Sequence, residues 1–217
     1  MNEQELIRKL RIFMLSQAYK VFEQTGELNI IYLEGFEYNA VTGKFSANRD
    51  KFDEWNDLRL VVDFNSGKVL HNAVATTEPG RKATFEKKSL ILGGVARIAF
   101  GQYQAWQMGW HKFTQYGKQH PALVQCSDIP VHRDVNQDGK RTGDPVGIGR
   151  GINQHSTHER FNSKSIGGYS YGCLVGKKWQ EHLTFLELLK TDIRYTKDEK
   201  YKFFTTIIAG DIFAGSK

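Results

Sequence analysis

The chain is poor in cysteine and proline, and it has no long apolar run. Of its 217 residues 2 are cysteine and 4 are proline, whereas 21 are glycine. Two cysteines, Cys126 and Cys173, are too few for a disulfide framework, which excludes the small disulfide-rich secreted class. No apolar run approaches the roughly 20 residues of a membrane-spanning helix, so no membrane span is predicted. Abundant glycine with little proline favours a sheet-rich fold with long loops.

The first residues lack the features of a signal peptide. The stretch MNEQELIRKLRIFMLSQAYKVFEQ is charged throughout and has no small-residue cleavage site. We therefore expect synthesis in the cytoplasm. Action outside the cell would then need a delivery route other than ordinary secretion.

The net charge of +6 is spread thinly along the chain. Short pairs such as Lys87-Lys88 and Lys177-Lys178 are too small to form a nucleic-acid-binding arm. The pattern favours a solvated basic surface and predicts no nucleic-acid partner. A basic surface also suits an acidic polymer such as a bacterial cell wall.

Hydrophobic periodicity predicts a mostly β (α+β) fold with two main helices. Residues 3–24 read as an amphipathic helix that Gly26 ends, and residues 179–190 read as a second helix. Residues 135–151 read as a polar, glycine-rich loop. Strands are expected within 28–36, 58–64, 69–77, 89–109, 122–134 and 201–213, with 58–64 and 69–77 joined as a hairpin. We expect an N-terminal helix over 1–27 and one domain over 28–217.

The stretch INQHSTHERFNSKSIGGYSYGCLVG, residues 152–176, holds the parts of a cysteine nucleophile. Such a nucleophile needs a base for its proton, a group that orients the base, and backbone donors for the oxyanion. His155 supplies a candidate base for Cys173, and Gly172 lets the backbone bend around an oxyanion. The alternative is a packed core thiol beside a hydrogen-bonded loop histidine.

The order and spacing of these residues resemble the L,D-transpeptidase (YkuD-like) catalytic domain. Fourteen residues, 156–169, separate His155 from Ser170-Tyr171-Gly172-Cys173, as between the histidine and the Ser/Thr-His-Gly-Cys segment of that family. The resemblance implies an L,D-transpeptidase-like β-sandwich and a Cys thioester formed with peptidoglycan stem peptides. An amine, water or another acceptor would then resolve the thioester, so the enzyme acts as a transferase or a hydrolase.

The resemblance assigns a role to each catalytic position. Cys173 is the nucleophile and His155 the base of a thiolate–imidazolium pair. The Ser156 carbonyl orients the other imidazole nitrogen, and Ser170 braces the turn. The N–H groups of Tyr171, Gly172 and Cys173 form the oxyanion hole. Three more residues are expected to contact substrate: His158, Tyr169 and Trp110.

Two positions depart from the family pattern. Tyr171 stands where the family has a second histidine, and Val175 stands where it has Asn or Arg. These changes indicate a divergent branch. The segment is similar to those of phage and phage-like proteins, which implies an endolysin-like lytic role or an injected one, with phage-tail or injection-apparatus proteins as partners.

The stretch DVNQDGKRTGD, residues 134–144, resembles the start of a calcium loop. Asp134, Asn136 and Asp138 alternate, with Gly139 in the sixth place. The twelfth place, usually Glu, is Pro145, and Asp144 comes one residue earlier. Bound Ca²⁺ and a metal-free Asx-rich turn are both consistent with this stretch. No other cofactor is expected.

Two other functions remain open. A metal-dependent cell-wall hydrolase would use a cluster drawn from His111, His120, His132, His155, His158 and Glu159, although no HExxH-type spacing is present. A non-enzymatic component of a phage or contractile injection particle would retain the fold without the activity. The aromatic-rich stretch 101–116, which includes Phe113 and Tyr116, is expected to serve mainly in the core.

Overall fold

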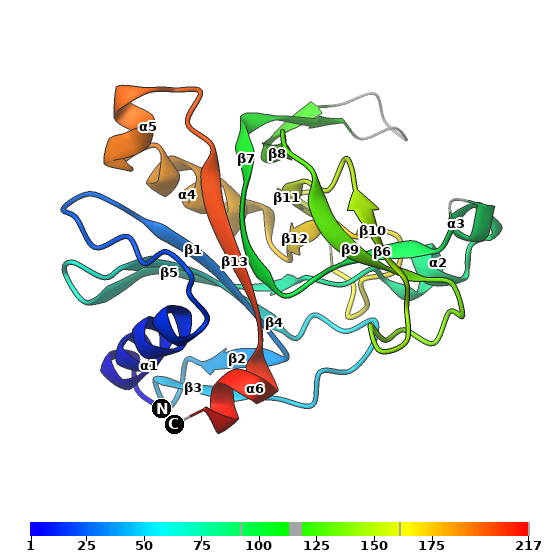
Figure 1. The fold of residues 1–217 in the computed structure, drawn as a ribbon, viewed down its shortest axis with the longest axis horizontal. Coiled ribbons are helices and arrows are strands. Elements are labelled where there is room, and N and C mark those ends of the chain that lie inside the picture. The colour runs from blue at the N-terminus through cyan, green and yellow to red at the C-terminus, as the bar shows by residue number, and fades with distance from the viewer. Residues whose placement is uncertain (92, 113–118, 161, 217) are drawn as a thin grey trace.

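Eight strands close into a barrel at the centre of the molecule (Figure 1). The computed structural model describes residues 1–91, 93–112, 119–160 and 162–216. The order around the barrel is β1-β13-β7-β8-β11-β12-β5-β4, with β1 parallel to β13 and β11 parallel to β12. The strands are β1 (Asn29–Glu34), β4 (Asp57–Asp63), β5 (Lys68–Thr76), β7 (Gly101–Lys112), β8 (Gln119–Gln125), β11 (Gln154–Ser156), β12 (Leu174–Gly176) and β13 (Phe203–Ala209).

The mostly β prediction is confirmed, with 37% strand and 22% helix. The strands form a closed barrel, however, where the resemblance implied a sandwich. Closure depends on β11 and β12, two strands of three residues each that bridge β8 to β5. Strands this short leave no periodic signal in the sequence, and both carry the residues of the Cys173 segment.

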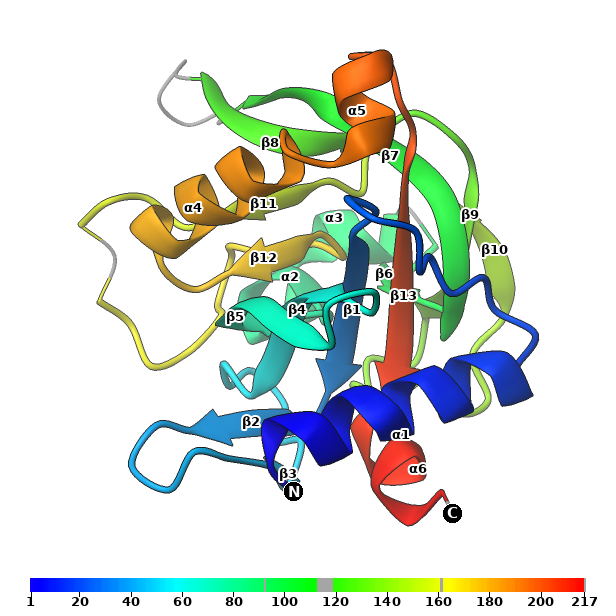
Figure 2. The same ribbon diagram turned by 90° about the vertical axis from the view of Figure 1, so that its left-hand side faces the viewer.

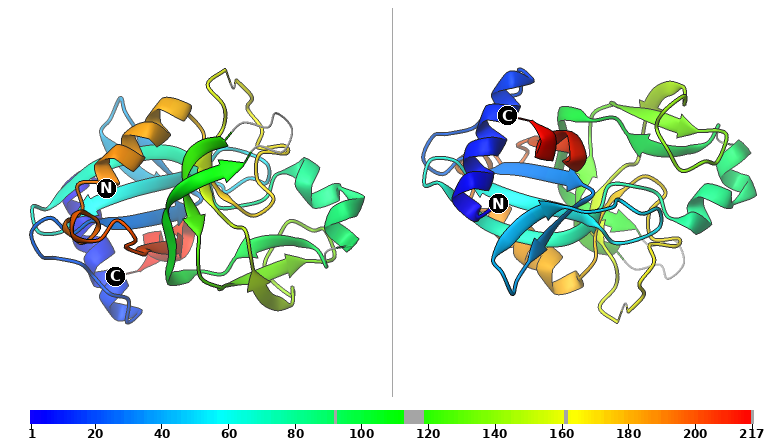
Figure 3. Two further views of the ribbon diagram at one scale, coloured as in Figure 1. Left: turned by 90° about the horizontal axis from the view of Figure 1, so that it is seen from above. Right: turned by 90° about the horizontal axis from the view of Figure 1, so that it is seen from below.

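Two smaller sheets and four short helices complete the fold. The β2 (Phe36–Asn39) and β3 (Lys44–Ala47) hairpin and the sheet β10-β9-β6 lie outside the barrel. That sheet comprises β6 (Val95–Ile98), β9 (Ile129–Asp134) and β10 (Val146–Gly149). The short helices are α2 (Arg81–Phe85), α3 (Lys87–Ile91), α5 (Ile193–Lys197) and α6 (Gly210–Gly215). Figure 3 shows the small sheet, α2 and α3 at the opposite end of the molecule from the N-terminal helix.

The N-terminal helix α1 (Glu3–Ser16) is part of the core. Its buried side chains are Leu6, Ile7, Leu10, Phe13 and Met14, and they pack against one face of β1 and β4. The other face of β1 points into the barrel, which explains why every residue of this strand is buried. Asn2 and Glu5 form a capping box at the start of the helix.

Both predicted helices exist, but the first ends earlier than expected. Helix α1 stops at Ser16 because Ala18 adopts a left-handed φ of 56°, and residues beyond it cross the barrel in extended form. Helix α4 (Trp179–Leu189) follows the Cys173 segment and packs against β8, β11 and β12 (Figure 2). Among the described residues, no helix is both long and apolar enough to cross a membrane.

Three other predictions need correction. Residues 89–91 belong to α3 and not to a strand, since the Ser89 hydroxyl bonds to the Ala83 carbonyl and no strand pairs with this segment. The loop expected over 135–151 contains β10. The closing strand ends at Ala209, which pairs with Glu34, the last residue of β1, and α6 begins at the next residue. The hairpin of β4 and β5 is confirmed.

Candidate active site

Strands β11 and β12 bring His155 and Cys173 to the same face of the barrel wall. His155 lies opposite Val175 in the parallel pairing, and Cys173 precedes Val175 by two residues. Because side chains alternate along a strand, residues two apart share a face. The Leu174 N–H donates to the Asn153 carbonyl at 3.0 Å, and this bond extends the pairing to the position of Cys173.

Cys173 is half-buried and is held by backbone groups of the strand beside it. Its Sγ accepts from the Asn153 N–H at 3.4 Å and lies 3.7 Å from the Gly151 carbonyl. Burial raises the pKa of the thiol to about 11, and the Asn153 N–H opposes that rise. Cys173 therefore rests as a neutral thiol at neutral pH.

His155 is buried, and its ring is fixed by its own strand. Its Nδ1 lies 2.9 Å from the Ser156 carbonyl, so Nδ1 carries the proton and Nε2 keeps the lone pair. This is the contact expected between these two residues. Burial, and then the charge of His111, hold the pKa of His155 well below its usual range. His155 is therefore a neutral imidazole with Nε2 as its basic atom.

The resting pair is therefore neutral, which differs from the expected thiolate–imidazolium pair. In a C126A variant, Cys173 is the only thiol, and its alkylation by iodoacetamide can be followed alone. We expect the rate to rise about tenfold per pH unit from pH 7 to 10, because only the thiolate reacts and its fraction grows up to the raised pKa. The urea-unfolded protein should level off near pH 8.5. A plateau below pH 8 in the folded protein would instead indicate a preformed ion pair.

A second imidazole lies against His155, and the sequence had associated the two only as members of a possible metal cluster. The His111 ring, from β7, stacks on the His155 ring at 4.0 Å between centroids and 9° between planes. His120, from β8, meets the His155 ring edge-on at 5.5 Å. Two imidazoles this close cannot both hold a proton at low cost, so His111 favours the basic form of His155.

Asn153 connects this second imidazole to the thiol. Its Oδ1 accepts from the Gln125 N–H at 2.9 Å, which leaves the Nδ2 amide to donate to His111 Nδ1 at 2.9 Å. The backbone N–H of the same residue faces Cys173 Sγ. Asn153 therefore fixes the position of both groups, and its place two residues before the predicted base is the sequence signal that could have revealed it.

The turn before Cys173 is built by Ser170 and Gly172. Ser170 Oγ donates to the Cys173 carbonyl at 2.9 Å and accepts from the Gly172 N–H at 3.1 Å, which is the bracing contact expected of it. The bond from the Gly172 N–H to Ser170 Oγ occupies one of the three N–H donors expected for the oxyanion hole. The Tyr171 and Cys173 N–H groups are the two donors left for it. Gly172 has a φ of +119°, which only glycine adopts readily.

Tyr171 does not substitute for the family's histidine beside the base. Its side chain is 44% exposed, and its hydroxyl donates to Glu86 at 2.6 Å, between α2 and α3. His111 supplies an imidazole to the site in its place, from a different strand. Val175 is fully buried against Trp55 and Ile166, so it serves packing.

The structure places the three residues expected to contact substrate in two different regions. The rings of His158 and Tyr169 lie 5.8 Å apart in the segment that joins β11 to β12. Trp110 precedes His111 in β7, so its side chain points to the opposite face from the active site. It borders a groove of about 250 Å³ with Leu183 and Leu186 of α4. Phe113 and Tyr116 lie outside the described residues.

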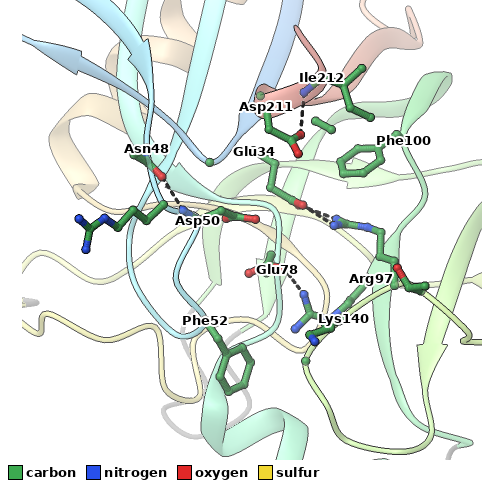
Figure 4. A pocket seen from close by; sticks show the side chains of 17 residues that line it. Glu34, Asn48, Asp50, Phe52, Glu78, Arg97, Phe100, Lys140, Asp211 and Ile212 are labelled. Atoms are coloured by element: carbon green, nitrogen blue, oxygen red, sulfur yellow. Dashed lines mark hydrogen bonds and ion pairs between the residues drawn. The ribbon is translucent and has the colours of Figure 1, made fainter. Parts of the chain in front are cut away.

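The histidine cluster is poorly arranged for zinc. The lone pairs of an imidazole lie in the plane of its ring, so two stacked, parallel rings cannot both direct a nitrogen at one ion. Among the described residues, the only group of three His, Cys, Asp or Glu side chains with ligand atoms within 4.8 Å of one another is Glu34, Asp50 and Glu78. This acidic group lies apart from the histidines, in a cavity of about 420 Å³ (Figure 4).

Arginines already neutralise two carboxylates of that acidic group. Arg141 forms a two-pronged ion pair with Glu34, and Arg97 pairs with Glu78. Burial and the charge of Glu34 raise the pKa of Asp50 to about 6 and also raise that of Glu78, whose shift the Arg97 guanidinium opposes. The cavity is thus a network of buried ion pairs that ties β1 and β6 to the loop between β9 and β10.

Comparison with known proteins adds no family to this description. No family model matches the chain, and neither a curated protein nor a solved structure gives a significant match. The barrel and the paired Cys173 and His155 therefore carry the functional argument on their own.

Proposed function

We propose that this chain is a cysteine acyl-transfer enzyme of the L,D-transpeptidase type, which acts on peptidoglycan stem peptides. The observation that carries the proposal is the shared face of His155, in β11, and Cys173, the residue before β12, with His155 Nδ1 held by the Ser156 carbonyl. Nucleophile, base and orienting group are the three parts that thiol catalysis needs. The motif of residues 152–176 supplies the substrate class by resemblance.

The first step transfers a proton and forms a thioester. His155 Nε2 takes the thiol proton as Cys173 Sγ attacks the carbonyl carbon of the stem peptide. The tetrahedral oxyanion accepts hydrogen bonds from the N–H groups of Tyr171 and Cys173. Collapse breaks the C–N bond, and the imidazolium returns its proton to the leaving amine. In the second step, an amine or water attacks the thioester carbonyl and releases the thiol.

A neutral resting pair suits this order of events. Substrate binding removes water from the site and brings the carbonyl to the thiol, so proton transfer and attack occur together. A stable thiolate would be consumed by oxidants between turnovers, whereas a buried thiol is protected. The departures at Tyr171 and Val175 leave this step unchanged, because Tyr171 bonds to Glu86 and Val175 is packed against Trp55 and Ile166.

Digestion of purified sacculi tests the proposal and its two rivals. The full chain should release or exchange stem-peptide fragments cut at an L,D-bond, as identified by mass spectrometry. Iodoacetamide should abolish this activity, while 1,10-phenanthroline should leave it intact. The reverse sensitivity would favour the metal-dependent hydrolase. No product from sacculi of several muropeptide types, and no thioester adduct, would favour a non-enzymatic particle component.

A further inference from the structure

We propose that the loop from Asp134 to Asp144, between β9 and β10, binds a calcium ion. The inference concerns a cation site that the proposed chemistry of Cys173 does not use. It depends on how the loop folds and on buried carboxylate oxygens that receive no hydrogen bond.

The loop folds around its own acidic side chains. Asp134 Oδ2 accepts from the Gly139 N–H at 3.1 Å, which draws the sixth residue back to the first. Gly139 has a φ of +73°, so the chain reverses at the place where a calcium loop needs a glycine. Asn136 Oδ1 accepts from the Asp138 N–H at 3.1 Å, and Asp138 Oδ1 accepts from the Lys140 N–H at 2.8 Å. Asp134 is thus buried where the bend begins, while Asn136 and Asp138 are exposed along it.

The stronger observation is a set of buried oxygens without donors. Asp134 is fully buried and Asp144 is 9% exposed. In the part of the chain that the structure describes, Asp134 Oδ1 and both carboxylate oxygens of Asp144 have no hydrogen-bond partner. Burying an unpaired carboxylate is costly, so buried carboxylates are normally paired with a cation or hydrogen-bonded. Three such oxygens at the two ends of one acidic loop indicate that a bound cation neutralises them.

Oxygen chemistry and loop length select calcium. Calcium takes 6–8 oxygen ligands in a flexible geometry, whereas Mg²⁺ demands a near-ideal octahedron of shorter bonds. The loop offers Asp134 Oδ1, Asn136 Oδ1, a carboxylate oxygen of Asp138, the Lys140 carbonyl and the Asp144 carboxylate. Asp144 occupies the eleventh place instead of the twelfth, and Pro145 then returns the chain to β10.

The neighbouring charges do not already satisfy the loop. Arg97 Nε lies 4.0 Å from Asp134 Oδ2, the oxygen that Gly139 also holds, and so leaves Oδ1 unpaired. The Arg97 guanidinium pairs with Glu78 instead. In the described residues the ligand atoms of the loop carboxylates do not lie within 4.8 Å of one another, so a bound cation would have to draw them together. The acidic group of Glu34, Asp50 and Glu78 is the weaker cation site, since arginines pair with two of its members.

The site would control the cavity shown in Figure 4. Residues 139–142 form one wall of that cavity, and Arg141 reaches from the loop to Glu34 at the end of β1. Gln137 also donates to the Thr84 carbonyl of α2 at 2.7 Å. Calcium binding would therefore fix the loop against the end of β1 and against α2.

Thermal unfolding of the full chain tests this proposal. After removal of metals with EGTA, CaCl₂ at about 100 times the dissociation constant should raise Tm by roughly 5–10 °C, and MgCl₂ at the same concentration should raise it less. D144N should be at least as stable as the wild type in EGTA, since it removes an unpaired buried charge, and should lose most of the calcium-dependent rise. D128N, at an exposed Asp of another loop, is the matched control and should keep the full rise.

Calorimetric titration with calcium is the measurement that could contradict the proposal. A wild-type chain with no binding heat and no calcium-dependent change in Tm would overturn the proposal. So would a D144N variant that keeps the full calcium-dependent rise. If D144N fails to fold, N136A, at an exposed position of the same loop, should still weaken calcium binding by at least tenfold. None of these measurements involves Cys173, so their outcome is independent of the proposed enzymatic function.

Discussion

Replacing Cys173 with alanine is expected to abolish thioester formation and to lower turnover on sacculi by about a thousandfold or more. By strand parity Cys173 shares the β11 and β12 face with His155, and its Sγ accepts a hydrogen bond from the Asn153 N–H. The measurement is intact-protein mass spectrometry after incubation with stem peptide, which detects the acyl adduct directly.

The control for this variant is the second cysteine. Cys126 is exposed and follows β8, so C126A should keep both the adduct and the turnover of the wild type. Removing the Cys173 sulfur leaves only a small gap beside Trp55, Ile166 and Val175, so the variant should retain the wild-type circular dichroism. An adduct that survives in C173A would place the nucleophile elsewhere.

The local contacts of the Cys173 segment were predictable because their signal lies within one stretch of sequence. His155, Ser156 and the Ser170–Cys173 segment lie within one stretch, and the contacts between them are backbone bonds or neighbours on paired strands. Such contacts follow from order and spacing. The hairpin of β4 and β5 and helix α4 were predictable for the same reason, since their periodic patterns run over seven residues or more.

The remaining parts of the site depend on long-range contacts. His111 and His155 are separated by 44 positions, and only the pairing of β7, β8 and β11 brings their rings together. Trp110 was expected at the site, but side chains alternate along β7 and Trp110 points to the opposite face from His111. The face of a strand residue cannot be assigned before the pairing register of the strand is known. Closure of the barrel was missed because β11 and β12 are too short to show an alternating pattern.

Replacing Gly172 with alanine is expected to lower the free energy of unfolding by about 2–6 kcal/mol. Two costs add: about 1–3 kcal/mol for a side chain at a φ that L residues avoid, and about 1–3 kcal/mol for overpacking. The second cost arises because a Cβ on Gly172 would lie 2.5 Å from the Ala96 carbonyl oxygen of β6, where the wall is backbone and cannot rotate away. Chemical denaturation of both proteins measures the difference.

Gly43 is a control for a positive φ in open space. It has a φ of +63° and no atom within 4 Å of the position of an added Cβ. We therefore expect G43A to lose only about 1–2 kcal/mol. The excess loss in G172A combines the higher backbone cost of a φ of +119° with the resistance of β6 to the added Cβ. It should come with a loss of turnover even at temperatures where the variant is fully folded, because any relief moves the Tyr171 and Cys173 N–H groups. Equal losses in the two variants would mean that β6 yields, and that the Ser170 bonds alone hold the nucleophile in place.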